Sequence, residues 1–278
     1  MLVAMVMFTS MAVFIRLSAE ELHAFVVVFF RNFLAVVLLA PWFLQRGLGV
    51  LRVNRWGLLA SRSLVNIVGM TAGFVAITMI PLAEAMSLGF TAPLFATLGA
   101  VLVLGEVIRA RRMIALAIGF AGVMLVLRPG FEAISVGSML ALTNAFTLAI
   151  TALIVKRLTA TEHPDSIVAW MVLLQSPLSL IPALFFWEWP TLGTWVLLFC
   201  LAGAGTLGHL CWTRAYTLVD MSQLQPMEFA KLPMAALIAY LVFAEVPSIW
   251  TWAGGIIIFA STAYISIREA QLARHRKT

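Results

Sequence analysis

Apolar residues run along this chain in ten long blocks, and short polar or basic stretches separate one block from the next. About 20 apolar residues in a helix are enough to cross the hydrocarbon core of a bilayer. The pattern therefore predicts an all-α polytopic membrane protein with ten transmembrane helices. The expected helices cover residues 2–17, 24–44, 56–77, 82–104, 112–127, 136–155, 167–186, 195–217, 222–243 and 250–267.

The composition agrees with a lipid environment. Of the 278 residues, 63% are hydrophobic and 11% are charged, whereas a soluble domain carries about 25% charged residues. This composition excludes a soluble enzyme, a nucleic-acid-binding domain and a disordered protein, and it makes the lipid bilayer the main partner. The first expected helix is short and lacks a basic n-region. A tilted helix or a truncated start therefore explains it better than a cleaved signal peptide does.

Basic residues are distributed unevenly between the two sides of the expected helices. If the N-terminus is cytoplasmic, twelve lysines and arginines fall on the inside, and only Arg16 and Arg128 fall outside. By the positive-inside rule, both termini are expected to be cytoplasmic, in a cell inner (plasma) membrane protein. The net charge of +6 then reflects topology and not binding of nucleic acid. The twelve residues are Arg46, Arg52, Arg55, Arg109, Arg111, Arg112, Lys156, Arg157, Arg268, Arg274, Arg276 and Lys277.

The chain also resembles itself at an offset of about half its length. Single matches are weak, but they share one register and so indicate a duplication. The matched pairs are Arg16 and Lys156, His23 and His163, Gly69 and Gly208, Ala76 and Ala215, Pro93 and Pro233, Glu106 and Glu245, and Arg128 and Arg268.

Each half of the duplication holds five expected helices. Because five is odd, the second half enters the membrane from the opposite face, which gives the inverted repeat found in many secondary transporters. We expect a first repeat at residues 1–130, a second, inverted repeat at 131–270 and a basic cytoplasmic tail at 271–278.

Two segments resemble the drug/metabolite transporter superfamily, and within it the EamA-like branch of ten-helix transporters. They read FFRNFLAVVLL at 29–39 and PLAEAMSLGFTAPLFATLGAVLVLGEVIRARRMIALAIGFAGVMLVL at 81–127. The resemblance implies a midplane cavity between the repeats and secondary-active transport of a small organic metabolite by alternating access, coupled to protons or to exchange. It leaves open the substrate and the direction of transport. The Glu228/Lys231 pair departs from the pattern of this family.

Charged and polar groups inside the expected helices are few, and each is costly enough in a bilayer to mark a candidate site. Glu228 and Lys231 are three residues apart and share one helix face. They form either a substrate or proton site or a mutually neutralised pair. His209 and Trp212 also share a face, where an imidazole can hold a proton and an indole can stack on a planar solute; the alternative is ordinary packing.

The predicted site residues therefore fall into two groups. Gating or coupling is expected at Arg31, Glu84 and Arg214. For Arg31, Arg62 and Arg214 the alternative is a long side chain that reaches the interface or pairs with a carboxylate. We expect helices 56–77, 82–104, 195–217 and 222–243 to line most of the cavity. The predicted substrate-binding residues are Asn66, Asn144, Trp170, His209, Trp212, Gln225, Glu228 and Lys231.

The sequence contains no motif of enzyme chemistry. It has no phosphate loop, HExxH segment, nucleophile elbow or Cys/His metal spacing, so we expect no cofactor. A membrane channel and a membrane-embedded enzyme acting on lipid remain the alternatives to a carrier. The sequence leaves open whether the chain forms a homodimer.

Overall fold

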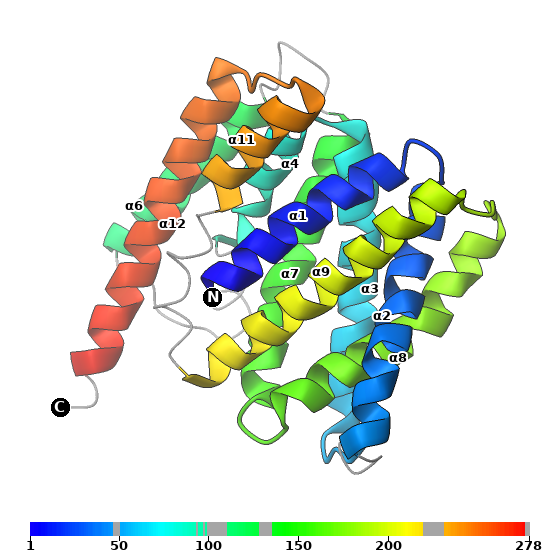
Figure 1. Ribbon diagram of the computed structural model, residues 1–278. Helices are drawn as coiled ribbons and strands as arrows, with labels where there is room; N and C mark the ends of the chain where they lie inside the picture. The colour runs from blue at the N-terminus through cyan, green and yellow to red at the C-terminus, as the bar shows by residue number, and fades with distance from the viewer. Residues whose placement is uncertain are drawn as a thin grey trace.

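Figure 1 shows the computed structural model, which describes residues 1–46, 51–92, 94–96, 98, 110–127, 135–218 and 231–275. Within these ranges the chain forms ten α-helices and no strand, which confirms the predicted fold class. The helices are α1 (Leu2–Ser18), α2 (Ala24–Arg46), α3 (Trp56–Met79), α4 (Leu82–Gly89), α6 (Ala110–Leu127), α7 (Val136–Leu158), α8 (Pro164–Leu184), α9 (Leu192–Leu218), α11 (Lys231–Phe243) and α12 (Ile249–His275).

Most helices begin and end within a few residues of the expected positions. Two helices differ more. Helix α4 ends at Gly89 although the expected helix ran to residue 104, and the chain forms a turn at Phe90 and Thr91. Helix α12 continues to His275 although the apolar block ends near residue 267. The extension reads REAQLARH, which contains good helix formers and no Gly or Pro. The segment expected as a basic tail therefore begins as helix.

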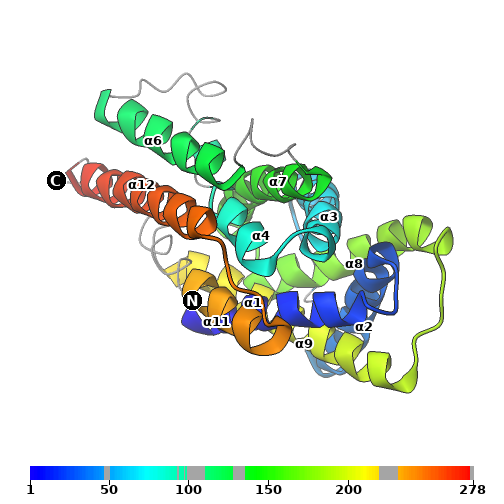
Figure 2. The same ribbon diagram turned by 90° about the horizontal axis from the view of Figure 1, so that it is seen from above.

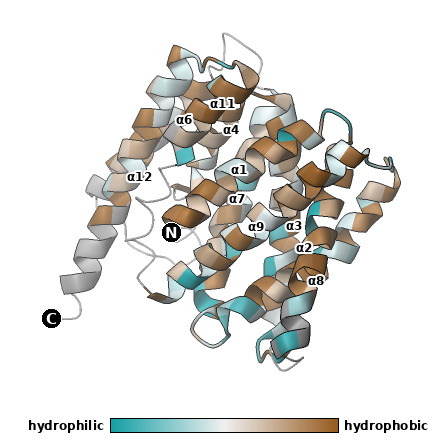
Figure 3. Ribbon diagram, viewed as in Figure 1, coloured by the Kyte–Doolittle hydropathy of each residue, from teal (hydrophilic) through white to brown (hydrophobic). Residues whose placement is uncertain are grey.

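Five of the described helices (α2, α3, α7, α8 and α9) are long and apolar enough to cross a membrane, and shorter apolar helices accompany them. Many large apolar side chains point outward, among them Phe185, which is 80% exposed, and Leu192, which is 85% exposed. Figure 3 shows hydrophobic residues along the outer faces of the helices. Hydrophilic residues concentrate around the turn between α7 and α8. This distribution matches a lipid-facing surface.

The helices pack with the symmetry of a duplicated unit. Helix α3 packs against α7 as α9 packs against α1, and the contact of α2 with α9 corresponds to that of α8 with α3. The pairs α2–α8 and α6–α12 each join equivalent helices of the two halves. Figure 2 shows that α6 and α12 lie side by side at the edge of the molecule.

Two carboxylates show that the repeats are inverted. Glu21, in the turn after α1, accepts a 2.7 Å hydrogen bond from the N–H of Thr191, just before α9. Glu162, in the turn after α7, accepts bonds of 3.1 and 3.2 Å from the N–H groups of Asn54 and Arg55, just before α3. The two turns are equivalent in the repeats but lie at opposite ends of the bundle (Figure 1). Each repeat thus caps a helix of the other, from opposite faces.

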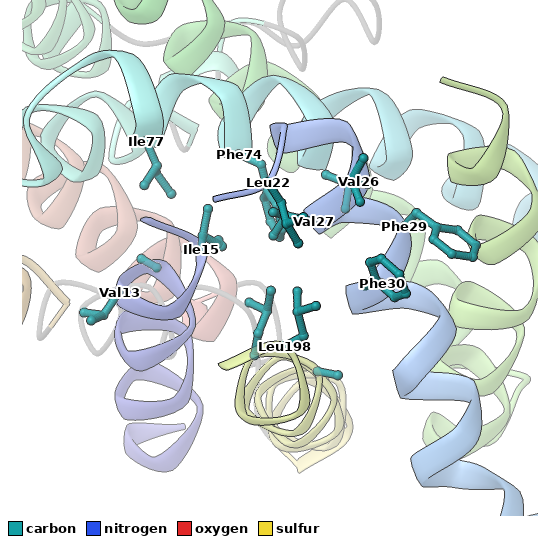
Figure 4. Close-up of a cluster of buried hydrophobic side chains, with 14 of the residues drawn as sticks. Val13, Ile15, Leu22, Val26, Val27, Phe29, Phe30, Phe74, Ile77 and Leu198 are labelled. Atoms are coloured by element: carbon teal, nitrogen blue, oxygen red, sulfur yellow. The ribbon is translucent and has the colours of Figure 1, made fainter. Parts of the chain in front are cut away.

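The largest hydrophobic cluster lies where α1, α2, α3 and α9 meet (Figure 4). Leu22 just before α2, and Val26 and Val27 in its first turn, face Leu198 of α9, and Phe74 of α3 closes the cluster. Because these four helices come from both halves, the cluster joins the repeats across the centre of the bundle.

Candidate functional site

A cavity of about 190 Å³ lies between the two repeats. It is larger than the roughly 150 Å³ cavities that admit one benzene molecule, so it accommodates an aromatic ring in this conformation. Apolar side chains, including Phe8, Phe74, Phe90 and Trp212, form much of its wall. The polar lining residues are Arg31, Asn66, Asn144, Thr151, His209 and Lys231.

Six of the predicted site residues line this cavity. They come from α2, α3, α7, α9 and α11, and they are brought together by helix packing although they are far apart in sequence. The six are Arg31, Asn66, Asn144, His209, Trp212 and Lys231.

Helices α1 and α7 contribute more lining than we expected from the sequence. Each supplies four residues, among them Phe8 and Asn144, although neither helix was among those expected to line most of the cavity. The cause is close approach at two equivalent glycines. A Cβ on Gly69 of α3 would lie 2.9 Å from Cβ of Thr147 in α7, and one on Gly208 of α9 would lie 2.8 Å from the Phe8 ring in α1. These contacts draw α1 and α7 into the central layer.

Hydrogen bonding fixes one amide of the lining. Gln175 of α8 donates from Nε2 to Oδ1 of Asn66 at 2.7 Å and to the carbonyl of Ser63 at 3.3 Å. Gln175 is fully buried, and its hydrogen bond to Asn66 fixes the orientation of the Asn66 amide. An amide fixed in this way presents a defined polar edge to a solute.

Aromatic and basic groups meet at the α1–α9 side of the cavity. The rings of Phe8 and His209 are 5.1 Å apart in an edge-to-face arrangement, and Trp212 follows 6.3 Å from His209. The Nζ atom of Lys231 lies 5.2 Å from the centroid of the Phe8 ring. This distance is within cation–π range. The predicted pair His209 and Trp212 therefore shares one wall with a cation.

Two arginines are buried near the cavity. Arg31 is 1% exposed and lines it, whereas Arg62 of α3 is fully buried behind it. The expectation that Arg62 reaches an exposed interface is wrong, because its guanidinium is enclosed by protein. Arg62 is not among the site residues predicted from the sequence. The one signal in the sequence that could have pointed to it is a charged residue within an apolar block.

Trp170 and Glu84 lie away from the cavity lining. Trp170 donates from Nε1 to the carbonyl of Leu51 at 2.9 Å and packs edge-to-face on Trp56. It therefore anchors the segment before α3, and the structure corrects the prediction that it faces substrate. Glu84 accepts a 3.0 Å bond from Ser138 at the start of α7, which places its carboxylate at an end of the bundle.

Arg214 also lies outside the cavity lining. Its Nε and Nη2 atoms donate to both oxygens of Asp165 at 2.7–3.0 Å. Asp165 is 2% exposed and stands in the first turn of α8, so the pair ties the end of α9 to the start of α8. The predicted residues Gln225 and Glu228 lie outside the described residues, as does Pro93.

Comparison with known proteins extends this picture. The model of the EamA-like transporter family matches residues 1–128 and 135–267, one match for each repeat. The chain belongs to the EamA-like transporter family. The predicted resemblance is thus confirmed, and with it a multi-pass inner-membrane protein of a transporter family.

Relatives of this EamA-like protein are named as transporters. It is 33% identical over 250 residues to the riboflavin transporter of Vibrio cholerae serotype O1, covering 88% of this chain and 83% of the relative. It is 29% identical to the S-adenosylmethionine uptake transporter of Rickettsia bellii, covering 90% and 86%. One solved crystal structure superposes with a TM-score of 0.67 at 19% identity, covering 95% of this chain and 94% of its own, and supports the fold.

Proposed function

We propose that this protein is a secondary-active carrier that moves a small planar aromatic metabolite across the inner membrane, with both termini in the cytoplasm. The observation that carries the proposal is the central cavity, which is enclosed by both repeats and lined by aromatic rings, amides and basic groups. In this proposal residues 1–130 and 131–270 are the two halves that move, and residues 271–278 form the basic tail.

Alternating access requires contacts that form and break at both ends of the bundle. At one end, Glu245 joins α11 to α1 through Arg16. At the other end, Lys156 of α7 donates a 3.0 Å bond to the carbonyl of Tyr216 in α9. Arg16 and Lys156 are matched positions of the two repeats, whereas their partners Glu245 and Tyr216 are not matched. We propose that the two ties open in turn as the cavity changes sides.

The cavity chemistry distinguishes between the substrates named for the relatives. S-Adenosylmethionine carries a sulfonium cation, whereas riboflavin is neutral and has a planar ring system. Arg31, His209 and Lys231 line the cavity, and its described lining holds no carboxylate. Such a site disfavours a cation. Riboflavin is therefore the first substrate to test. S-adenosylmethionine is the second candidate, because some relatives are named as S-adenosylmethionine uptake transporters.

A fused-ring solute is larger than the cavity in this conformation. Its entry therefore requires the two halves to separate, which is the movement that alternating access provides. We propose that Asn66 and Asn144 bind polar edges of the ring and that Trp212 stacks on its face. Glu228 and Lys231 remain candidates for coupling.

Binding tests the proposal in a simple form. Titration of the purified protein with riboflavin should quench flavin fluorescence at saturable sites. Replacing Trp212 by Leu should weaken binding about fivefold, because stacking of aromatic groups is worth about 1 kcal/mol. Replacing Trp189 by Leu is the matched control, since that indole is 73% exposed outside the cavity. Equal affinities in the two variants contradict a substrate site at Trp212.

A further inference from the structure

The centre of the bundle holds two arginines for which the described residues supply no counter-charge. Arg31 donates from Nη1 to Oδ1 of Asn32 at 2.9 Å. Its Nε and Nη2 atoms, and all three side-chain nitrogens of Arg62, have no acceptor within the described part of the chain. Both guanidiniums are buried. An uncompensated buried cation raises the free energy of the folded protein, particularly within a bilayer. Binding of an anion would therefore stabilise this pair.

Four carboxylates of the described residues are engaged elsewhere. Each of the four binds a hydroxyl, a backbone N–H group or another arginine. The described examples are Glu84 with Ser138, Glu162 with Asn54 and Arg55, Asp165 with Arg214, and Glu245 with Arg16.

The orientation of Arg31 suits an anionic ligand. The side chain starts about 10 Å along α2, by the rise of 1.5 Å per residue, and it reaches the cavity wall. Its unpaired Nε and Nη2 atoms form the fork that binds a carboxylate or phosphate through two hydrogen bonds. Gly205 of α9 leaves room for this fork, since a Cβ there would lie 2.9 Å from both nitrogens.

Neighbouring charges reinforce the preference. Arg62 lies within electrostatic range of Arg31, and both guanidiniums lie within range of His209. The two arginines give this side of the cavity a positive potential that raises the local concentration of anions. Asn66 and Asn144 add uncharged polar edges to the same lining.

We infer that the cavity selects a planar organic anion, whose carboxylate or phosphate group binds the Nε–Nη2 fork of Arg31 while its ring lies among Phe8 and Trp212. This inference rests on the proposed function, because it names the charge class of the substrate at the same site. It predicts that a neutral flavin is bound less tightly than an anionic one.

Three flavins that share one ring system provide the test. They are riboflavin, riboflavin 5′-phosphate and 10-carboxymethylflavin, titrated into the purified full-length protein in a buffer without phosphate or carboxylate. At least one anionic flavin should bind about tenfold more tightly than riboflavin, as expected for a charge-assisted bidentate contact. The Arg31→Met variant should lose this preference. The relative affinities of the two anions distinguish a phosphate from a carboxylate ligand.

Two further variants sharpen the result. Gly205→Ala should reduce the preference, because the added methyl group displaces the guanidinium. Arg52→Met is the matched control. Arg52 is exposed before α3, so its replacement should leave the preference unchanged.

Without ligand, Arg31→Met should raise the apparent melting temperature by about 2 °C, because it removes an uncompensated buried charge. A lower melting temperature would show that the protein already compensates the charge of Arg31 and would overturn the inference.

The outcomes separate this inference from the proposed function. If riboflavin binds as tightly as both anions, or if Arg31→Met keeps the preference, the anion site is refuted and the carrier proposal stands. If none of the three flavins binds, a flavin-like substrate is refuted together with the anion site.

Discussion

The guanidinium of Arg16 lies 2.5 Å from the carboxylate of Glu245, which joins the end of α1 to the segment after α11. Glu245 also accepts a 3.0 Å bond from the N–H of Leu82 at the start of α4. The Arg16 guanidinium in turn lies 4.8 Å from the centroid of the Phe243 ring. One carboxylate therefore holds together elements of both repeats at this end of the bundle.

Replacing Glu245 by Gln should loosen this end. The pair is partly exposed, so we expect a loss of about 1 kcal/mol in the free energy of unfolding, the value typical of a charge-assisted bond screened by solvent. Thermal unfolding in detergent measures it. Glu188→Gln is the control, because Glu188 lies in the exposed loop after α8. An equal effect in both variants would mean that the Arg16–Glu245 pair adds nothing.

Glu21 should make stability depend on pH only under acid conditions. Hydrogen bonds from Thr194 and Thr191 lower the pKa of the Glu21 carboxyl from its usual 4.5. A lowered pKa in the folded state means that the unfolded chain binds more protons, so this contribution is complete above pH 4.5 and is lost as the pH falls below it. The difference in melting temperature between the wild type and Glu21→Gln should therefore be constant from pH 6 to 8, the range in which about all of this carboxyl is ionised. It should shrink toward acid pH, and a difference that grows there would refute this role.

Gly69→Ala should destabilise the contact of α3 with α7. The added Cβ would lie 2.9 Å from Cβ of Thr147, so the helices must separate. Overpacking of this kind costs about 1–3 kcal/mol. Gly57→Ala tests the same substitution near the start of α3, where nothing lies within 4 Å, and should be neutral or stabilising. Equal melting temperatures for the two variants would contradict close packing at Gly69.

Arg214 and Asp165 should behave as a coupled pair. Asp165 is buried and Arg214 is about half exposed, so the coupling should be about 1–2 kcal/mol, between the values for surface and buried pairs. A double-mutant cycle with Asp165→Asn and Arg214→Met measures it by thermal unfolding. Additive effects would show that the bidentate geometry contributes no stability.

The sequence predicts the fold better than it predicts the site. Helix positions follow from local apolar runs. The matched histidines show that the repeat in the sequence also predicts equivalent local structure. His23 and His163 each accept a bond from the backbone N–H two residues later, at the start of α2 and of α8. The pairing of Arg214 with Asp165 was not predictable, because it depends on how α8 and α9 pack. The burial of Arg62 was missed for the same reason.

Counterflow in proteoliposomes tests the central claim most directly. Vesicles that contain the purified protein are loaded with unlabelled riboflavin and then given labelled riboflavin outside. A carrier that alternates between two faces exchanges one for the other, so label should accumulate transiently above its equilibrium level, and riboflavin 5′-phosphate should compete with it. A channel would give simple equilibration without stimulation by the internal substrate, and a lipid-modifying enzyme would give altered lipid without exchange. Either result would contradict the account, and so would label uptake equal to that of protein-free vesicles.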